Sequence, residues 1–210
     1  MTEKLGVTVI DYGLGNLRSV TRGLEKAGAE VEISSQPGDV RTADSLVLPG
    51  VGAFAEGMEG ASDLQDAIKE SAEDTPLLGI CLGMQMLLSE SEEGSGETVE
   101  GLDLIPGKVS RFPENVGKVP HMGWNSLDNV EEHPVFDGIN QGSYVYFVHS
   151  FYAHTDSDLT TTNYGKMEFA STVVNDRGNV VGTQFHPEKS GDVGLRILNN
   201  FVEFSHNRRY

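Results

Sequence analysis

The sequence has little cysteine, few basic residues and no long apolar run, and each shortage excludes a class of protein. Cys81 is the one cysteine among 210 residues, so no internal disulfide can form and the thiol stays free for chemistry, as fits a reducing compartment. No run of about eighteen apolar residues occurs, and the N-terminus lacks the charged-then-apolar pattern of a secretion signal. We therefore expect a cytoplasmic protein that does not enter a membrane.

Basic residues are the second shortage. Lys and Arg total 15 against 32 Asp and Glu, which gives a net charge of −17. Such a surface repels nucleic acid and anionic membranes, so neither is expected as a partner. We interpret the acidity as an adaptation to a high-salt cytoplasm, where acidic side chains stay hydrated and their mutual repulsion is screened. A generally acidic surface with no special meaning is the alternative.

Short apolar segments alternate with helical patterns through the first half of the chain. With 38% hydrophobic residues and this length, we expect one α/β domain over residues 1–210. The alternation predicts a mostly parallel central sheet with helices on both faces. Sites in such sheets gather at the carboxyl ends of the strands, so Asp11, Gly50 and Cys81, which all follow strands, should share one edge. The expected strands are 7–10, 31–33, 45–48 and 77–80, and the expected helices are 17–28 and 62–71, the latter with Ser62 as its N-cap.

The second half of the chain has a different texture. After Gly101, short strand-like segments are separated by Pro, Gly and Asn, which predicts an added antiparallel strand region within the same domain. Residues 180–185 predict a final strand, and the apolar positions within 193–202 share one face of a closing helix. The acidic stretch 90–101 is expected to be a surface loop. The glycines at 13–15 lack the third glycine of a dinucleotide site, and no cofactor is expected.

The most informative segment is GICLGMQ at 79–85. The apolar run before Cys81 predicts a strand, and the Met and Leu residues within 84–88 predict a helix, with Cys81 at the turn between them. Gly79 and Gly83 flank it in the thiol version of the G-x-S-x-G nucleophile elbow, a turn too sharp for a Cβ on either side. A lone cysteine in an apolar strand is usually a small buried hydrophobe. The two glycines favour the elbow instead, which places the sulfur at a helix N-terminus, where the thiolate is favoured.

A cysteine nucleophile requires a base, and six histidines are candidates. His186 ends a strand and precedes a proline, which restricts it to an extended conformation. Glu188 falls on the same side if the chain stays extended, so its carboxylate could orient the imidazole. Taken alone, His186 could be structural and Glu188 a solvated acid. The histidines lack paired metal-ligand spacing, so no metal site is expected.

Together these residues resemble a known family. GICLGMQ at 79–85 and FHPE at 185–188 resemble the class I (triad) glutamine amidotransferases. Four further segments resemble, more narrowly, the glutaminase subunits of imidazole glycerol phosphate synthases, and the likeness runs from about Val7 to Ser190. These segments are DYGLGN at 11–16, PGVGAF at 49–54, VPHMGWN at 119–125 and YFVHS at 146–150.

The resemblance implies a glutaminase with a catalytic triad of Cys81, His186 and Glu188 and a glutamyl thioester intermediate. It also implies an oxyanion hole made of backbone N–H groups, a role that glycine-rich backbone suits. The residues of that oxyanion hole are Gly50, Val51, Gly52 and Leu82. The residues that line the glutamine pocket are Gln85, Glu93, His149, Ser150 and Phe151.

A partner is implied as well, a (β/α)8 cyclase subunit that forms a heterodimer with this chain and receives its ammonia. The cyclase would combine that ammonia with a phosphoribulosyl nucleotide, giving imidazole glycerol phosphate for histidine biosynthesis and an aminoimidazole carboxamide ribotide. Met122, Trp124 and Lys189 would face the cyclase, although ordinary core packing is the alternative for Met122 and Trp124. The family is nearly idle until the partner holds its ligand, and we expect the switch to be a flip of the Val51 peptide, which neighbouring glycines make inexpensive.

Two other functions remain open at the level of sequence. A glutaminase of the same class could feed a different synthase, although this length leaves no room for a fused synthetase domain. An idle binding module on the same fold would have no reason to keep Cys81, His186 and Glu188 together.

Overall fold

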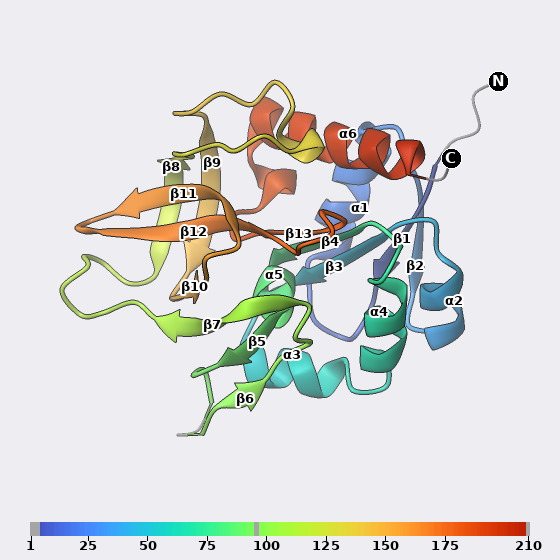
Figure 1. Ribbon diagram of the computed structural model, residues 1–210, viewed down its shortest axis with the longest axis horizontal. Coiled ribbons are helices and arrows are strands. Elements are labelled where there is room, and N and C mark those ends of the chain that lie inside the picture. Colours follow the sequence, from blue (N-terminus) through green and yellow to red (C-terminus); the bar gives the residue numbers. More distant parts are fainter. Residues whose placement is uncertain (1–4, 95–96, 209–210) are drawn as a thin grey trace.

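The computed structural model describes residues 5–94 and 97–208 (Figure 1). The helices are α1 (Leu17–Lys26), α2 (Pro37–Thr42), α3 (Phe54–Gly60), α4 (Gln65–Ser71), α5 (Leu82–Met86) and α6 (Gly191–Asn207), with short 3-10 helices η1 (Pro134–Phe136) and η2 (Pro187–Lys189). The strands are β1 (Gly6–Ile10), β2 (Glu30–Ser34), β3 (Leu46–Gly50), β4 (Leu77–Cys81), β5 (Leu88–Ser91), β6 (Val99–Glu100), β7 (Ile105–Arg111), β8 (His121–Ser126), β9 (Tyr144–His149), β10 (Phe151–His154), β11 (Asp158–Tyr164), β12 (Met167–Val174) and β13 (Val180–Thr183). Within the described ranges, no helix combines the length and apolar character needed to cross a membrane.

One large sheet organises the molecule, in the order β2-β1-β3-β4-β13-β12-β10-β7-β5-β6, with β11 paired to β12. The first five strands in this order, β2, β1, β3, β4 and β13, run parallel to one another. Beyond β13 the pairing is antiparallel except between β5 and β7, and β8 and β9 form a separate antiparallel pair. The parallel central sheet and the antiparallel region of the second half are therefore both confirmed.

Helices cover both faces of the parallel strands, as predicted. Helices α1 and α6 lie on one face, and α3, α4 and α5 lie on the other (Figure 1). Successive residues of a strand point to opposite faces, so Val47 packs in the core with Leu24 and Leu198, while Leu48 packs in the other core with Phe54. All five side chains are buried, and each such burial stabilises the fold by roughly 1.5–3 kcal/mol.

The register of the parallel strands brings the segments of interest to one edge. Gly50 at the end of β3 pairs with Cys81 at the end of β4. On the other side of β4, Thr183 at the end of β13 pairs with Ile80, one residue before Cys81. The carboxyl ends of these three strands therefore meet, and this is the edge where sites form in sheets of this type.

The predicted helix over 62–71 is shorter than expected, and its predicted N-cap is wrong. Helix α4 begins at Gln65, after a turn in which the Ser62 backbone N–H still donates to the carbonyl oxygen of Glu59 at 3.1 Å. Residues 61–64 thus continue the end of α3, a helix that the sequence analysis did not predict. Ser62 cannot cap a helix while its own backbone remains tied to the preceding one.

Two expectations near Cys81 also need correction. The helix after Cys81 ends at Met86, and Leu88 begins strand β5, where it pairs with Ile105. The acidic stretch 90–101 is not simply a loop, because Glu90 and Ser91 pair with residues of β6, and Ser91 is fully buried. Residues 95–96 of this stretch lie outside the described residues. Pairing with neighbouring strands outweighs the polar composition here.

Candidate active site

Cys81 occupies a sharp turn between β4 and α5. Its backbone has φ 55° and ψ −106°, a conformation that residues other than glycine rarely adopt and that costs of order 1–3 kcal/mol. The flanking glycines are required by close packing. A Cβ on Gly83 would overlap the carbonyl oxygen of Leu48, and a Cβ on Gly79 would lie 2.8 Å from the backbone nitrogen of Met84. The predicted strand–turn–helix geometry is therefore present.

A cleft of about 330 Å³ opens beside Cys81. The residues expected for the nucleophile, the oxyanion hole and the base that line it are Val51, Gly52, Cys81, Leu82 and His186. All five residues expected for glutamine binding line it too, namely Gln85, Glu93, His149, Ser150 and Phe151. Segments far apart in the sequence thus meet in one cavity of a size that suits an amino-acid side chain and backbone.

His186 and Glu188 form a buried pair behind this cleft. Nδ1 of His186 lies 2.8 Å from Oε1 of Glu188, and the two side chains are 2% and 1% exposed. The predicted cause of this contact is wrong, because the chain does not stay extended. Pro187 begins the 3-10 helix η2, and its turn brings the carboxylate back to the imidazole.

The protonation of His186 reflects two opposing influences. Burial lowers the pKa of the imidazole, but Cys81 and Glu188 outweigh burial and raise the pKa to about 9. Nε2, the ring nitrogen away from Glu188, is buried and makes no hydrogen bond of regular geometry with any described residue. His186 can therefore carry a proton at neutral pH and present it from Nε2 beside the sulfur.

The segment from Gly50 to Gly52 passes directly beside Cys81. Gly50 has no room for a side chain, because a Cβ would overlap the Tyr12 hydroxyl and lie 2.7 Å from Cβ of Leu82. The Tyr12 hydroxyl donates to the carbonyl oxygen of Pro49 at 2.7 Å. Gly52 has φ +110°, and a Cβ there would lie 3.9 Å from Oε2 of Glu56 and 3.9 Å from Cδ1 of Leu14, which are ordinary contact distances. The start of this segment is therefore tightly packed, and its end is packed less closely.

Two of the expected glutamine-binding residues also hold the walls of the cleft. Nε2 of Gln85 donates to the carbonyl oxygen of Phe151 at 3.1 Å. Oε2 of Glu93 accepts from the backbone N–H of Phe54 at 3.0 Å, at the start of α3. Burial raises the pKa of Glu93, although the hydrogen bond from Phe54 acts in the opposite direction.

His149 belongs to a buried chain of hydrogen bonds. Its Nδ1 lies 2.8 Å from the carbonyl oxygen of Phe151, and its Nε2 lies 2.9 Å from Nδ1 of His121. Burial lowers the pKa of His149 to about 3 and that of His121 to about 4, so both rings are neutral at pH 7. With neutral rings, His121 donates to His149, and His149 donates to Phe151. This chain of hydrogen bonds holds the Ser150–Phe151 segment in place.

The residues expected at a partner surface lie outside the cleft. Met122 and Trp124 are 62% and 55% exposed, so core packing, the alternative interpretation, is wrong for both. They are two residues apart on β8 and therefore share one face of that strand. Lys189 is also exposed.

One buried residue at the site was missed by the sequence analysis. Gln184 is fully buried, and its Nε2 lies 3.8 Å from Sγ of Cys81. A signal was present, since Gln184 is two residues before His186 and successive side chains of an extended chain alternate sides. A buried glutamine directly after the buried strand β13 also requires hydrogen-bond partners, which makes its position informative.

Comparison with known proteins finds relatives over nearly the whole length of this chain. The family model for class I glutamine amidotransferases matches residues 8–204. A protein of Natronomonas pharaonis named imidazole glycerol phosphate synthase subunit HisH is 58% identical over 206 residues, covering 94% of each chain. Proteins of the same name from Halobacterium salinarum and Methanosarcina acetivorans are 57% and 55% identical, each aligned over 94% of this chain and over 93% and 98% of their own lengths.

Solved structures share the fold at lower identity. A putative GMP synthase protein from Thermoplasma acidophilum superposes with a TM-score of 0.76 at 19% identity, covering 100% of this chain and 98% of its own. The PurLQS structure from Thermotoga maritima gives 0.74 at 21% identity, with 96% and 99% covered. Because the family model and the HisH relatives span nearly the whole sequence, the chain belongs to the class I glutamine amidotransferases and, within them, to the family of HisH subunits of imidazole glycerol phosphate synthase.

Proposed function

We propose that this chain is a glutaminase that hydrolyses glutamine to glutamate and passes the ammonia to a cyclase subunit for histidine biosynthesis. The observation that carries the proposal is the cleft in which Cys81, on its strained turn, meets the buried His186–Glu188 pair. The free thiol suits a reducing compartment, and we place the reaction in the cytoplasm.

The chemistry follows from the groups around Cys81. Its thiolate attacks the side-chain amide carbon of glutamine, and backbone N–H groups of Val51 and Leu82 stabilise the oxyanion of the tetrahedral intermediate. The protonated His186 donates to the departing nitrogen, so ammonia leaves and a glutamyl thioester remains. His186, now neutral, takes a proton from water, which attacks the thioester and releases glutamate and the Cys81 thiol. Glu188 orients the ring and stabilises its charge throughout.

The remaining lining residues give the cleft its selectivity for glutamine. We assign the carboxylate of Glu93 to the α-amino group of the substrate, because an acid within the cleft complements a cation. Gln85, Ser150 and Phe151 offer amide, hydroxyl and backbone groups to the rest of the amino acid. The donation from Gln85 to Phe151 keeps these two walls at a fixed separation.

The exposed pair on β8 is the proposed centre of the cyclase interface. Met122 and Trp124 have the composition of an interface core, where aromatic residues and methionine are enriched. Lys189 follows the catalytic Glu188 and provides a charged contact near the same site. The (β/α)8 cyclase would use the ammonia to make imidazole glycerol phosphate and aminoimidazole carboxamide ribotide.

We place the activating switch at the peptide of Val51. Gly50 is packed closely against Tyr12 and Leu82, whereas Val51 is 40% exposed and a Cβ at Gly52 would meet no atom closer than 3.9 Å. A peptide flip confined to Val51 and Gly52 would turn one N–H group toward or away from the oxyanion. Binding of a loaded cyclase would favour the orientation that stabilises the intermediate.

The deciding experiment is glutamate release from glutamine with and without a cyclase subunit loaded with its nucleotide ligand. We expect strong stimulation by the loaded cyclase and none in Cys81→Ala. Trp124→Ala should weaken cyclase binding by about 2 kcal/mol or more, whereas Ile33→Ala, an exposed apolar residue on edge strand β2, should leave it unchanged. Rapid release that ignores the cyclase would instead assign this glutaminase to a different synthase.

A further inference from the structure

Gln184 has no role in the mechanism described above, yet its amide lies beside the reacting sulfur. Nε2 of Gln184 lies 3.8 Å from Sγ of Cys81, within the range of a hydrogen bond to sulfur. The side chain is fully buried, at the end of β13 and next to the strand that carries Cys81. A buried amide in such a position is fixed by its partners.

The orientation of this amide is determined by Gln85. The carbonyl oxygen of Phe151 can only accept, so the group of Gln85 that lies 3.1 Å from it is the NH2 group. The same NH2 group lies 3.0 Å from Gln184, which must therefore present its Oε1 to Gln85. The NH2 group of Gln184 is consequently directed at Cys81.

Besides the imidazole of His186, the sulfur of Cys81 has two uncharged polar neighbours, and they are of opposite kind. The carbonyl oxygen of Val148, at 3.9 Å, can only accept and so favours the protonated thiol. The NH2 group of Gln184 can only donate and so favours the thiolate. A hydrogen bond to a charged acceptor is roughly twice as strong as one between neutral groups, so the donor has more effect on the thiolate than the acceptor has on the thiol.

We propose that Gln184 is a further catalytic residue, which donates a hydrogen bond to the Cys81 thiolate and is held in the donating orientation by Gln85. The proposal rests on the proposed function only in that Cys81 is the nucleophile. It links the nucleophile to the glutamine-binding wall, because Gln85 contacts both Gln184 and Phe151. Once Cys81 is acylated, its sulfur is uncharged and the donor contributes less, so the hydrogen bond acts on the free thiolate and not on the thioester.

The test is the pH dependence of alkylation of the isolated full chain by iodoacetamide, in which the thiolate displaces iodide and forms a carbon–sulfur bond. Cys81 is the single cysteine, so all label reports on this site. Gln184→Met removes the donor at similar volume, and the midpoint of the alkylation profile should rise by about one pH unit, which is about a tenfold loss of rate below the midpoint. Gln184→Asn keeps the amide but shortens it, and its midpoint should rise in the same direction.

Gln65→Met is the matched control. Nε2 of Gln65 donates to the carbonyl oxygen of Met58 at 3.0 Å, away from the cleft, so its midpoint should equal that of the unmodified protein. An unchanged midpoint in a folded Gln184→Met or Gln184→Asn variant would overturn the proposal. Failure of the proposed function would give a different result. Glutamine would then go unhydrolysed with every cyclase, while the alkylation midpoint of Gln184→Met would still rise.

Discussion

At the scale of single residues, the buried histidines of this chain differ in proton affinity because their neighbours differ. His186 shares its site with Cys81 and Glu188, and its pKa is raised to about 9 even though burial acts to lower it. Among the described residues, no carboxylate is hydrogen-bonded to the rings of His121 and His149, and burial lowers their pKa values to about 4 and 3. Ionised groups next to a buried imidazole therefore decide whether it can act as an acid at neutral pH.

Glu188→Gln tests this account of His186. The pKa of His186 is higher in the folded state than its ordinary value of 6.5, so its protonation contributes stability that is complete below pH 6.5 and is lost as the pH rises through about 9. The variant keeps an oxygen for the hydrogen bond but loses the charge. Its free energy of unfolding should consequently fall less between pH 6 and pH 9 than that of the unmodified protein, as measured by urea titration at both pH values.

The exposed Glu59 supplies the control for this comparison. Glu59→Gln makes the same chemical change away from the cleft and should keep the pH dependence of the unmodified protein. NMR titration of the His186 imidazole should show a lower pKa in Glu188→Gln. An imidazole pKa that does not move would mean that Glu188 does not set the charge of the ring.

At the scale of elements, the elbow depends on a close contact between α5 and β3. Gly83→Ala would force a Cβ into the carbonyl oxygen of Leu48 and should destabilise the protein by about 3 kcal/mol or more. Gly38→Ala is the matched control, because apart from its chain neighbours and its own helix backbone no described residue comes within 4 Å of a Cβ at that position in α2, and its effect should stay below about 1 kcal/mol. Chemical denaturation of both variants measures the difference, and equal stabilities would show that the elbow tolerates a side chain.

The sequence predicted the long elements well because their signals are local. The strand β4 carries a continuous apolar run, and the helix α6 carries apolar residues on one face; both signals agree with the burial in the structure. Helix α3 has no such signal at its start, since Ala53 cannot cap it and the acceptor for Phe54 comes from Glu93, far along the chain. Helix α2 carries a local signal, Pro37 at its first position, although no helix is predicted there above.

The candidate site was predicted in the same uneven way. The motif residues were predicted to act together, and the cleft does bring most of them into one cavity. What sequence alone could not supply were contacts that depend on tertiary packing, such as the turn of η2 that joins His186 to Glu188. The contact between the Gln184 amide and Cys81 is of the same kind, because it depends on β13 lying beside β4 in the sheet.

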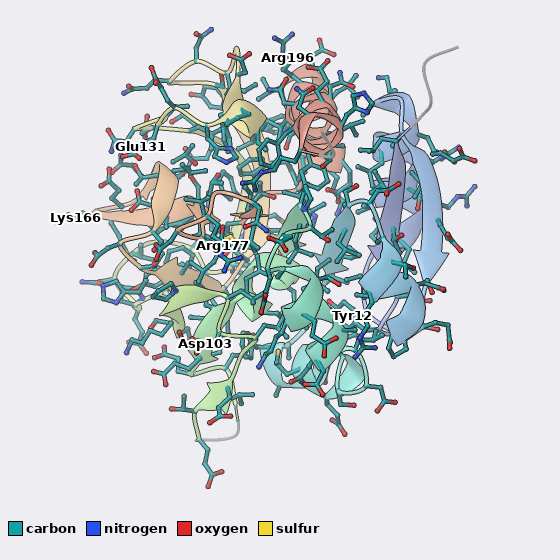
Figure 2. All side chains as sticks on the ribbon, turned by 45° about the vertical axis from the view of Figure 1, so that its right-hand side comes forward. Tyr12, Asp103, Glu131, Lys166, Arg177 and Arg196 are labelled. Atoms are coloured by element: carbon teal, nitrogen blue, oxygen red, sulfur yellow. The ribbon has the colours of Figure 1, made fainter. Side chains whose placement is uncertain are left out.

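At the scale of the whole molecule, the excess of acidic residues is the dominant surface property. Side chains ending in oxygen project around much of the outline, with Asp103 and Glu131 among those labelled (Figure 2). Ion pairs such as Arg41–Glu70 and Arg177–Asp74 engage a small share of the 32 acids. The folded chain therefore holds a large uncompensated charge, whose self-repulsion opposes compaction.

Salt should relieve this repulsion. The screening length falls from about 10 Å at 0.1 M to about 3 Å at 1 M, so the thermal unfolding midpoint should rise across a KCl series from about 0.1 to about 2 M. Replacing both Glu30 and Glu32, exposed on edge strand β2, by Gln should recover part of that gain at low salt. If the protein folds fully at low salt and its unfolding midpoint does not rise in molar KCl, the acidic surface is not an adaptation to high salt.

The position of β13 in the sheet has a consequence for how the protein is made. Of the described strands this is the last in sequence, yet it lies between β4 and β12 and joins the parallel strands to the antiparallel ones. While a ribosome is still synthesising residues before Val180, the two parts of the sheet lack the strand that connects them, and neither His186 nor Glu188 exists. On the mechanism proposed above, a nascent chain therefore carries Cys81 before its proposed base exists, and glutamine hydrolysis has to wait until β13 and residues 186–188 have been synthesised.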